Sequence, residues 1–458
     1  MSGIALICVF VIAIIVMIWL IAKVNVHPFL ALMSISLALA FIAGIPLAKI
    51  PAMIGDGFSG MFKSIGIVII FGAIIGMVLE KTGAAMKLAD LVVKLVGHKN
   101  PELAMLIMGW VVGIPVFCDS GFVVLNPIRE ALRKKILANP LGMTVALSAG
   151  LYASHVFIPP TPGPIAAAGA VGLSHNLLLV IGIGVLVSIP VLFASYLFAK
   201  WVSRNMTLTE ENPDDLIAKS YDELLKQYGS LPSGTLSLAP ICAPIFLMAL
   251  GSISKILEIG GDLGILLQFL GHPIIALAIG VIFSILLLIK THKVGDFDQL
   301  TNDTLKLVGP ILFITAAGGV LGKVITQAGF VEYIKQNAHI ISTAGIFFPF
   351  LIAAILKSAQ GSSTVAIITT ASIMGMFHAQ DSLMNALGLT SEMAAALTVM
   401  AISSGAMCVS HANDSYYWVV TNFSKMTPQQ GYRTQTTLTF IMGIVGIITV
   451  YLLSLILL

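Results

Sequence analysis

The stretch His-Pro-Phe-Leu-Ala-Leu at residues 27–32 recurs in the second half of the chain as His-Pro-Ile-Ile-Ala-Leu at residues 272–277. Outward from this pair, three glycines of the first half fall opposite three of the second at nearly the same offset: Gly72, Gly76 and Gly83 against Gly318, Gly322 and Gly329. The dipeptide Ser-His at 154–155 has a counterpart at 410–411, with a small drift that short loop insertions could supply. The sequence therefore predicts two copies of one structural unit.

The composition places this doubled chain in a membrane. Of 458 residues, 58% are hydrophobic and 10% are charged, which is too little polar surface to coat a soluble particle of that size. Apolar runs such as 4–21, 177–198 and 440–458 reach the roughly 20 residues needed to cross about 30 Å of hydrocarbon. They lack the alternation of barrel strands, so we predict an all-α polytopic membrane protein. Two membrane-spanning copies usually carry a solute between them.

Other classes find little support in the sequence. The first apolar run follows an uncharged start, with no positive region before it, so we expect a retained first helix and not a signal peptide. The four cysteines lie far apart and match neither a metal site nor a disulfide framework. A net charge of +3 and the lack of a basic, aromatic-rich face argue against nucleic acid. We expect no cofactor, no metal and no nucleic-acid partner.

The polar and apolar stretches divide the chain into two repeats. Residues 201–237 form the only sizeable polar stretch, which predicts a cytoplasmic linker between a first repeat at 1–200 and a second at 238–458. Each repeat has about five apolar spans, one of them interrupted, at 141–174 and 391–423. Two more apolar stretches, 101–132 and 342–377, have arms of only about 11 to 15 residues, short for a crossing. We predict re-entrant hairpins there, with ordinary paired helices as the alternative.

The basic residues predict how the repeats are oriented. If the two hairpins do not cross, most Lys and Arg residues, including the cluster at 129–135, fall on one side of the membrane. Positive charge concentrates on the cytoplasmic side of bacterial membrane proteins. Five crossings per repeat, an odd number, would invert the second repeat and place both termini in the periplasm.

Polar residues gather at the two hairpin tips and at the two interrupted spans. Polar groups are unfavourable at mid-membrane depth unless they line a site. The sequence Pro-Pro-Thr-Pro-Gly-Pro at 159–164 cannot continue a helix, so the first interrupted span must break there. Broken helices hold substrates and ions in many transporters, whereas polar turns bonded only to themselves are the alternative reading. The predicted substrate-binding residues are Cys118, Asp119, Ser120, Gly121, Ser154, His155, Thr161, Gly163, Gln360, Gly361, Ser362, Ser363, Thr364, Ser410, Asn413 and Ser415.

Four ionisable residues in these segments are candidates for carrying a coupling proton: Asp119, His155, His411 and Asp414. For each histidine, a hydrogen-bonded packing role is an equal alternative. Lys357 is the only cation near them in sequence, at the end of the second hairpin's first arm. The many carbonyls and hydroxyls would also suit sodium, so a sodium-coupled carrier stays open.

Two features of the repeats are better explained by packing than by ligand binding. Gly72 and Gly76, like Gly318 and Gly322, have the small-xxx-small spacing that lets helices approach closely. The His-Pro pairs at 27 and 272 stand where proline opens a helix without losing a hydrogen bond. An intramembrane enzyme is disfavoured, because no His-Glu-x-x-His pattern occurs and the adjacent residues 154 and 155 would point about 100° apart on a helix.

Four motifs together resemble the gluconate permease family of bacterial proton symporters: Gly-Ile-Pro-Val-Phe-Cys-Asp-Ser-Gly-Phe at 113–122, Pro-Pro-Thr-Pro-Gly-Pro at 159–164, Ala-Gln-Gly-Ser-Ser-Thr-Val-Ala at 359–366 and Ser-His-Ala-Asn-Asp-Ser at 410–415. The resemblance covers essentially the whole chain. It implies uptake of a small organic acid across the bacterial inner membrane. It also implies a homodimeric, elevator-type carrier of the wider ion-transporter superfamily. The scaffold of such a carrier would include helices within 4–80 and 238–327.

The chain departs from the family pattern at residues 118–120 and at Thr161, which are the first hairpin tip and the first break. The resemblance therefore leaves the substrate open among gluconate, related aldonates, shorter hydroxy acids such as glycerate or threonate, and a hydroxy amino acid such as D-serine.

Overall fold

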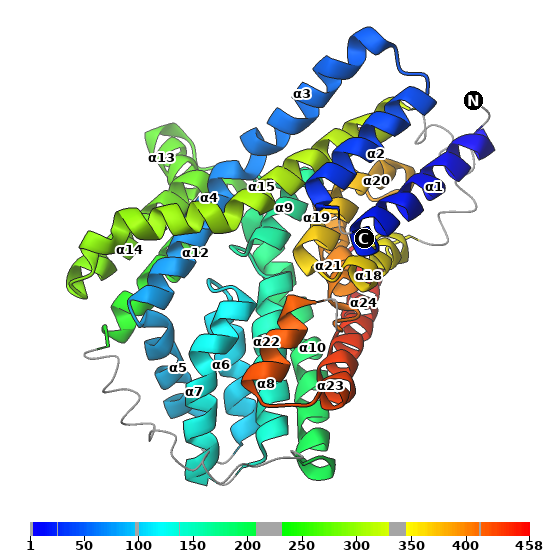
Figure 1. Ribbon diagram of the computed structural model, residues 1–458. Coiled ribbons are helices and arrows are strands. Elements are labelled where there is room, and N and C mark those ends of the chain that lie inside the picture. Colours follow the sequence, from blue (N-terminus) through cyan, green and yellow to red (C-terminus); the bar gives the residue numbers. More distant parts are fainter. Residues whose placement is uncertain are drawn as a thin grey trace.

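The computed structural model describes residues 3–24, 26–96, 100–136, 138–207, 231–328, 345–411 and 414–458. Every regular element in these ranges is a helix, which confirms the predicted all-α class (Figure 1). Within the same ranges, six helical segments are long and apolar enough to cross a membrane: 140–170, 177–205, 234–255, 273–290, 294–327 and 428–457.

One set of helices, called the frame here, packs along the upper and left part of the view in Figure 1. It takes helices from both halves of the sequence, with α15 packed against α2, α3 and α4. The frame consists of α1 (Gly3–Ala22), α2 (Pro28–Ile42), α3 (Ile50–Met61), α4 (Ile67–Lys81), α12 (Gly234–Ile256), α13 (Gly261–Gly271), α14 (Pro273–Lys290) and α15 (Phe297–Gln327).

The remaining helices form a second set, called the core bundle. Its centre is α8 and α9, in which every residue is buried. The bundle consists of α6 (Pro101–Gly113), α7 (Cys118–Ile136), α8 (Pro140–Phe157), α9 (Pro162–Ala170), α10 (Leu177–Asn205), α18 (Phe347–Gln360), α19 (Ser363–Met374), α20 (Leu383–Ala386), α21 (Glu392–Met407), α22 (Ser415–Phe423), α23 (Pro428–Gly431) and α24 (Thr437–Leu457). Helix α5 (Ala84–Val96) contacts α12 of the frame and α6 of the bundle.

The helices are interrupted at the positions that their prolines, glycines and polar residues predict. Helices α6 and α7 are separated by residues 114–117, and α8 and α9 by the proline-rich 158–161. Between α18 and α19, Gly361 takes a left-handed conformation with φ of 87°, which glycine adopts without steric strain. The next residue, Ser362, caps α19 by accepting a hydrogen bond from the backbone N–H of Val365 at 3.3 Å. The predicted hairpin tips and breaks are thus real interruptions of helix.

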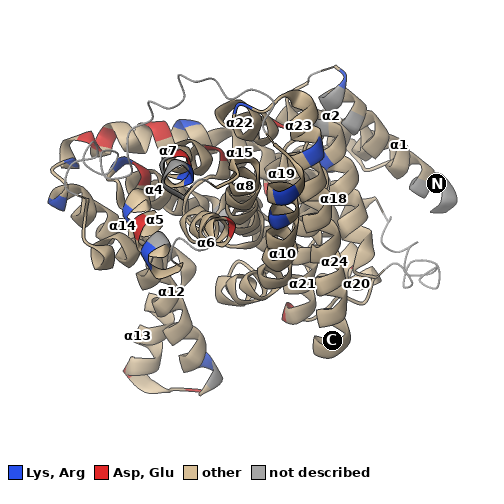
Figure 2. Ribbon diagram, turned by 90° about the horizontal axis from the view of Figure 1, so that it is seen from below, with Lys and Arg blue, Asp and Glu red and all other residues tan. Residues whose placement is uncertain are grey.

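Several helices begin earlier than hydropathy predicts. Hydropathy predicts apolar spans at 65–80 and 307–327, but α15 already starts at Phe297, and α3 continues through residues 62–66 into α4. Helices α5 and α13 were not predicted at all. These additional turns carry charges such as Asp56 and Asp303, and helix formation does not require apolar residues, so hydropathy finds only the part suited to hydrocarbon. Figure 2 shows how few charged residues the helices carry, and α12 and α13 extend away from the rest.

The paired glycines lie between the frame and the core bundle. A Cβ on Gly72 of α4 would lie 2.8 Å from the carbonyl oxygen of Pro160, and one on Gly76 would overlap the carbonyl of Pro115. On α15, a Cβ on Gly322 would lie 2.7 Å from the carbonyl oxygen of Ser372. These glycines therefore serve close packing, as the sequence predicted.

The His-Pro pairs begin helices, also as predicted. The Nδ1 atom of His27 accepts a hydrogen bond from the backbone N–H of Phe29 at 3.3 Å at the start of α2. His272 directly precedes α14, where Pro273 is the first residue. The inverted orientation of the repeats, the re-entrance of the hairpins and the periplasmic termini stay predictions, and most of the predicted linker, residues 208–230, lies outside the described residues.

Candidate functional site

A buried ion pair joins the second hairpin to the second helix break. The Nζ atom of Lys357, in the last turn of α18, lies 2.6 Å from Oδ2 of Asp414, which directly precedes α22. The two side chains are 0% and 6% exposed. Charges so far from water persist only when they are paired and hydrogen-bonded, so this contact is the electrostatic centre of the core bundle.

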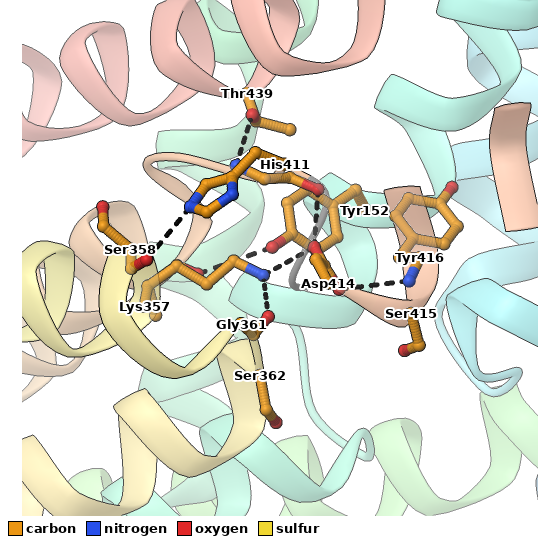
Figure 3. Close-up of polar contacts among 12 residues, drawn as sticks. Tyr152, Lys357, Ser358, Gly361, Ser362, His411, Asp414, Ser415, Tyr416 and Thr439 are labelled. Carbon is orange, nitrogen blue, oxygen red and sulfur yellow. Dashed lines mark hydrogen bonds and ion pairs between the residues drawn. The ribbon is translucent and has the colours of Figure 1, made fainter. Parts of the chain in front are cut away.

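The polar atoms of this pair have further partners. The ammonium of Lys357 also donates to the backbone carbonyl of Gly361 at the hairpin tip (Figure 3). The carboxylate of Asp414 accepts from the hydroxyl of Ser410 at 2.5 Å and from the backbone N–H of Tyr416 at 3.1 Å. Asp414 thus links the start of α22 to the tip between α18 and α19, and Ser410 supports its carboxylate.

Two tyrosines shield the pair. The rings of Tyr152 on α8 and Tyr416 on α22 stack with centroids 5.3 Å apart, and both are almost fully buried. The ammonium of Lys357 lies 5.9 Å from the centre of the Tyr152 ring, within cation–π range. Because these rings exclude water, charge interactions here are stronger than at the protein surface.

The first hairpin tip reaches the same place from the other repeat. Asp119 is in the first turn of α7 and is half-buried. Its Oδ1 accepts from the hydroxyl of Ser415 at 3.5 Å, and the thiol of Cys118 lies 3.7 Å from its Oδ2. The structure therefore brings one hairpin tip from the first half of the chain to the helix break of the second half.

The two histidines differ in their surroundings. His155 stands near the end of α8, is 6% exposed and packs against Phe117, with ring centroids 6.0 Å apart. Its Nδ1 is among the buried polar atoms of the described chain that have no hydrogen-bond partner. His411 is hydrogen-bonded, since its Nε2 lies 3.0 Å from the carbonyl oxygen of Ser358 on α18. His155 is thus the better placed of the two for a ligand or a water.

In several predicted binding residues, the hydroxyl group donates a hydrogen bond to a backbone carbonyl three or four positions earlier in the sequence. The hydroxyl of Ser154 donates within α8, that of Thr161 donates to the carbonyl of residue 158 at 2.8 Å, and that of Ser120 donates to the carbonyl of residue 117 at 3.3 Å. Gly121 and Gly163 are packed positions, where a Cβ would lie 2.8 Å and 3.1 Å from a Leu and an Ile side chain. These five residues shape the site.

Three more of the predicted residues lie at the second tip. Ser362 caps α19, Ser363 is buried and Thr364 is half-buried. Asn413 lies outside the described residues, as does the side chain of Gln360.

Sequence reasoning noted Lys357 without giving it a role, and it missed both tyrosines. A single lysine in an otherwise apolar arm was the available signal, because an intramembrane cation needs a partner. Tyr152 and Tyr416 had no such signal, since buried aromatic residues in helices usually serve packing alone.

A bundle of apolar helices with four interruptions, two of which meet at a buried ion pair, is typical of a membrane carrier. The family model described as "GntP family permease" matches residues 4–456, so this chain belongs to that family and is a transporter, not an enzyme.

Individual proteins agree with this assignment. The chain is 31% identical to the inner membrane permease YgbN of Escherichia coli strain K12, over 97% of this chain and 98% of that protein. It is 28% identical to a gluconate permease of Zymomonas mobilis, over 96% and 95% of the two chains. Its fold is similar to the crystal structure of the YdaH transporter of Alcanivorax borkumensis, with a TM-score of 0.66 at 14% identity, covering 94% of this chain and 99% of that one.

Proposed function

We propose that this permease imports a sugar acid, gluconate or a related aldonate or short hydroxy acid, by proton symport across a bacterial inner membrane. The substrate class is supported by the gluconate permease relative and the location by the inner membrane relative. The observation that carries the proposal is the buried Lys357–Asp414 pair at the meeting point of both hairpin tips. In this pair, Lys357 is a cation that could bind the carboxylate of a substrate, and Asp414 is a carboxylate that could bind a proton.

The polar surroundings suit a hydroxylated acid. Three residues with hydroxyl groups are close in sequence to the pair: the half-buried Ser362 and Thr364 at the second tip, and the exposed Ser415 directly after Asp414. Hydroxyl groups both donate and accept hydrogen bonds, as a chain of substrate hydroxyls requires. Asp119, His155 and His411 remain candidates for assisting proton movement.

The contact between the two helix sets suggests how the carrier moves. Glycines of α4 and α15 bring the frame close to backbone atoms of the core bundle. A rigid bundle can slide past such a surface more readily than past interdigitated side chains. We therefore propose an elevator motion of the core bundle against a frame that also carries the homodimer contact.

Uptake into proteoliposomes tests the proposal. The purified protein is supplied with labelled gluconate under an imposed pH gradient, an imposed sodium gradient, or neither, with protein-free liposomes as the control. Accumulation driven by the pH gradient alone, inhibited by unlabelled aldonates, glycerate or threonate, is the expected result. Accumulation that requires sodium would replace the proton with a sodium ion, and a lack of competition by every carboxylate, including D-serine, would refute the substrate class.

A further inference from the structure

We infer that Lys357 is the binding site for the substrate's carboxylate, and that Asp414 occupies it whenever the carrier is empty. Proton binding to Asp414 then releases Lys357 to the substrate. This rests on the proposed function and adds its coupling device: one cation shared by two carboxylates in turn. No covalent bond changes in this step, since the proton moves from solution to Asp414 and the ammonium keeps its charge.

Lys357 is the one cation in the described chain placed for this role. Among those residues, the buried cationic side chains are Lys357 and Arg129. Arg129 lies near the start of α8, where its guanidinium donates to the side chains of Asn126 and Glu130 and to the carbonyl of Pro140. An acid entering between the hairpin tips therefore meets a single buried positive charge.

The ammonium group is held by contacts that can be exchanged. A lysine ammonium has three donors, of which one bonds Asp414 and another the carbonyl of Gly361. The hydrogen bond to the Gly361 carbonyl keeps the ammonium at the hairpin tip after Asp414 has dissociated from it. Asp414 in turn retains its bonds from Ser410 and the N–H of Tyr416. An incoming carboxylate can thus replace Asp414 at the ammonium without unfolding either segment.

Other titratable groups face the pair from the helices packed around it: Cys118 and Asp119 on α7, Tyr152 and His155 on α8, His411 before α22 and Tyr416 on α22. Asp414 is singled out because it alone contacts the ammonium, at 2.6 Å. Protonation of any other group would leave the Lys357–Asp414 pair in place and the cation unavailable.

The balance of charge between the pair and the substrate then favours coupling. In the empty site, the pair carries one positive and one negative charge. In the fully loaded site, the ammonium, the substrate's carboxylate and an uncharged aspartic acid give the same sum, and the neighbouring Asp119 contributes equally to both forms. The proton alone would add one positive charge to this sum, and the substrate alone would add one negative charge. Adding net charge to a group that moves through hydrocarbon is unfavourable, so the two forms of equal charge cross most readily.

Equilibrium binding of labelled gluconate to purified variants, measured from acidic to alkaline pH, tests this inference. Wild-type affinity should rise on acidification by up to about tenfold per pH unit. Asp414→Asn leaves the cation permanently available, so its affinity should no longer depend on pH. Lys357→Gln should weaken binding about ten- to 150-fold at every pH, the range for losing a hydrogen bond to a charged group.

Matched variants separate the possible failures. Lys306→Gln removes the cation of an exposed ion pair, 3.4 Å from Asp303, and should bind as the wild type does. The double variant Lys357→Gln, Asp414→Asn keeps no buried charge at the pair, and should bind weakly at all pH values even if Asp414→Asn fails to fold.

The outcomes distinguish this inference from the proposed function. If the wild type binds no sugar acid, the proposed function fails and the inference falls with it. If the wild type binds with pH dependence but Asp414→Asn retains that dependence, or Asp119→Asn abolishes it, the inference is overturned while the function stands. Unchanged binding by Lys357→Gln or by the double variant would overturn it as well.

Discussion

Replacing Lys357 by Met should destabilise the protein far more than replacing Lys357 and Asp414 together. With an effective dielectric constant near 20, the attraction between charges 2.6 Å apart is about 6 kcal/mol. Desolvation of the two ions offsets this by several kcal/mol each, so the intact pair contributes little net stability. Removing one partner leaves the other buried and uncompensated, which costs about 3 to 5 kcal/mol.

The expected order of stability follows from this difference. Lys357→Met and Asp414→Asn should each lower the unfolding midpoint strongly, and the double variant should recover to within about 1 to 2 kcal/mol of the wild type. Thermal unfolding of the detergent-solubilised variants, followed by intrinsic fluorescence at one scan rate, measures this order. A fixed rate is needed because unfolding of a large protein is often irreversible.

The stability of the double variant Lys357→Met, Asp414→Asn shows whether the two side chains interact. If its loss equals the sum of the two single losses, the side chains act independently and the ion pair does not exist in the resting protein. Lys306→Met provides the control, since its side chain and that of its partner Asp303, 3.4 Å away, are 79% and 45% exposed and both stay solvated. It should cost no more than about 1 kcal/mol.

Three further predictions concern the surroundings of the site. Gly76→Ala places a methyl group into the tip of the first hairpin and should cost about 1 to 3 kcal/mol and slow uptake, whereas Gly60→Ala, which meets no atom within 4 Å, should leave both unchanged. Ser410→Ala removes a hydrogen bond to the Asp414 carboxylate, so the thermal midpoint should fall by the equivalent of about 1.5 to 3 kcal/mol, and an unchanged midpoint would contradict the 2.5 Å contact. Glu392→Gln alters an exposed hydrogen bond to His175, 3.0 Å away, and the stability should change by less than about 1 kcal/mol in the same assay; a larger loss would show that this contact supports the bundle.

Much of the fold was predictable because its causes are local. Apolar runs identify helices in a bilayer, and the clustered prolines at 159–164 and the left-handed Gly361 interrupt them locally. The four interruptions, the paired glycines and the helix starts at 27 and 272 therefore followed from the sequence. Helices α5 and α13 did not, since hydropathy does not mark helices that carry charges or fall short of a crossing.

The site was predictable as a set of segments but not as a set of contacts. Asp119, His155, His411 and Asp414 could be named from the sequence, because polar groups inside apolar runs are rare and conspicuous. Which of these residues contact one another could not be predicted from the sequence. Lys357 and Asp414 are 57 positions apart, and Asp119 and Ser415 are 296 apart.

The amino-acid sequence by itself determined an all-α membrane carrier with interrupted helices, since apolar runs, prolines and glycines influence the backbone of the residues beside them. Only the tertiary structure decided that α18 and the segment before α22 place an ammonium and a carboxylate together under two tyrosine rings. The physical reason is that such a pairing depends on how separate helices pack, and packing is a property of the whole bundle that no single segment encodes.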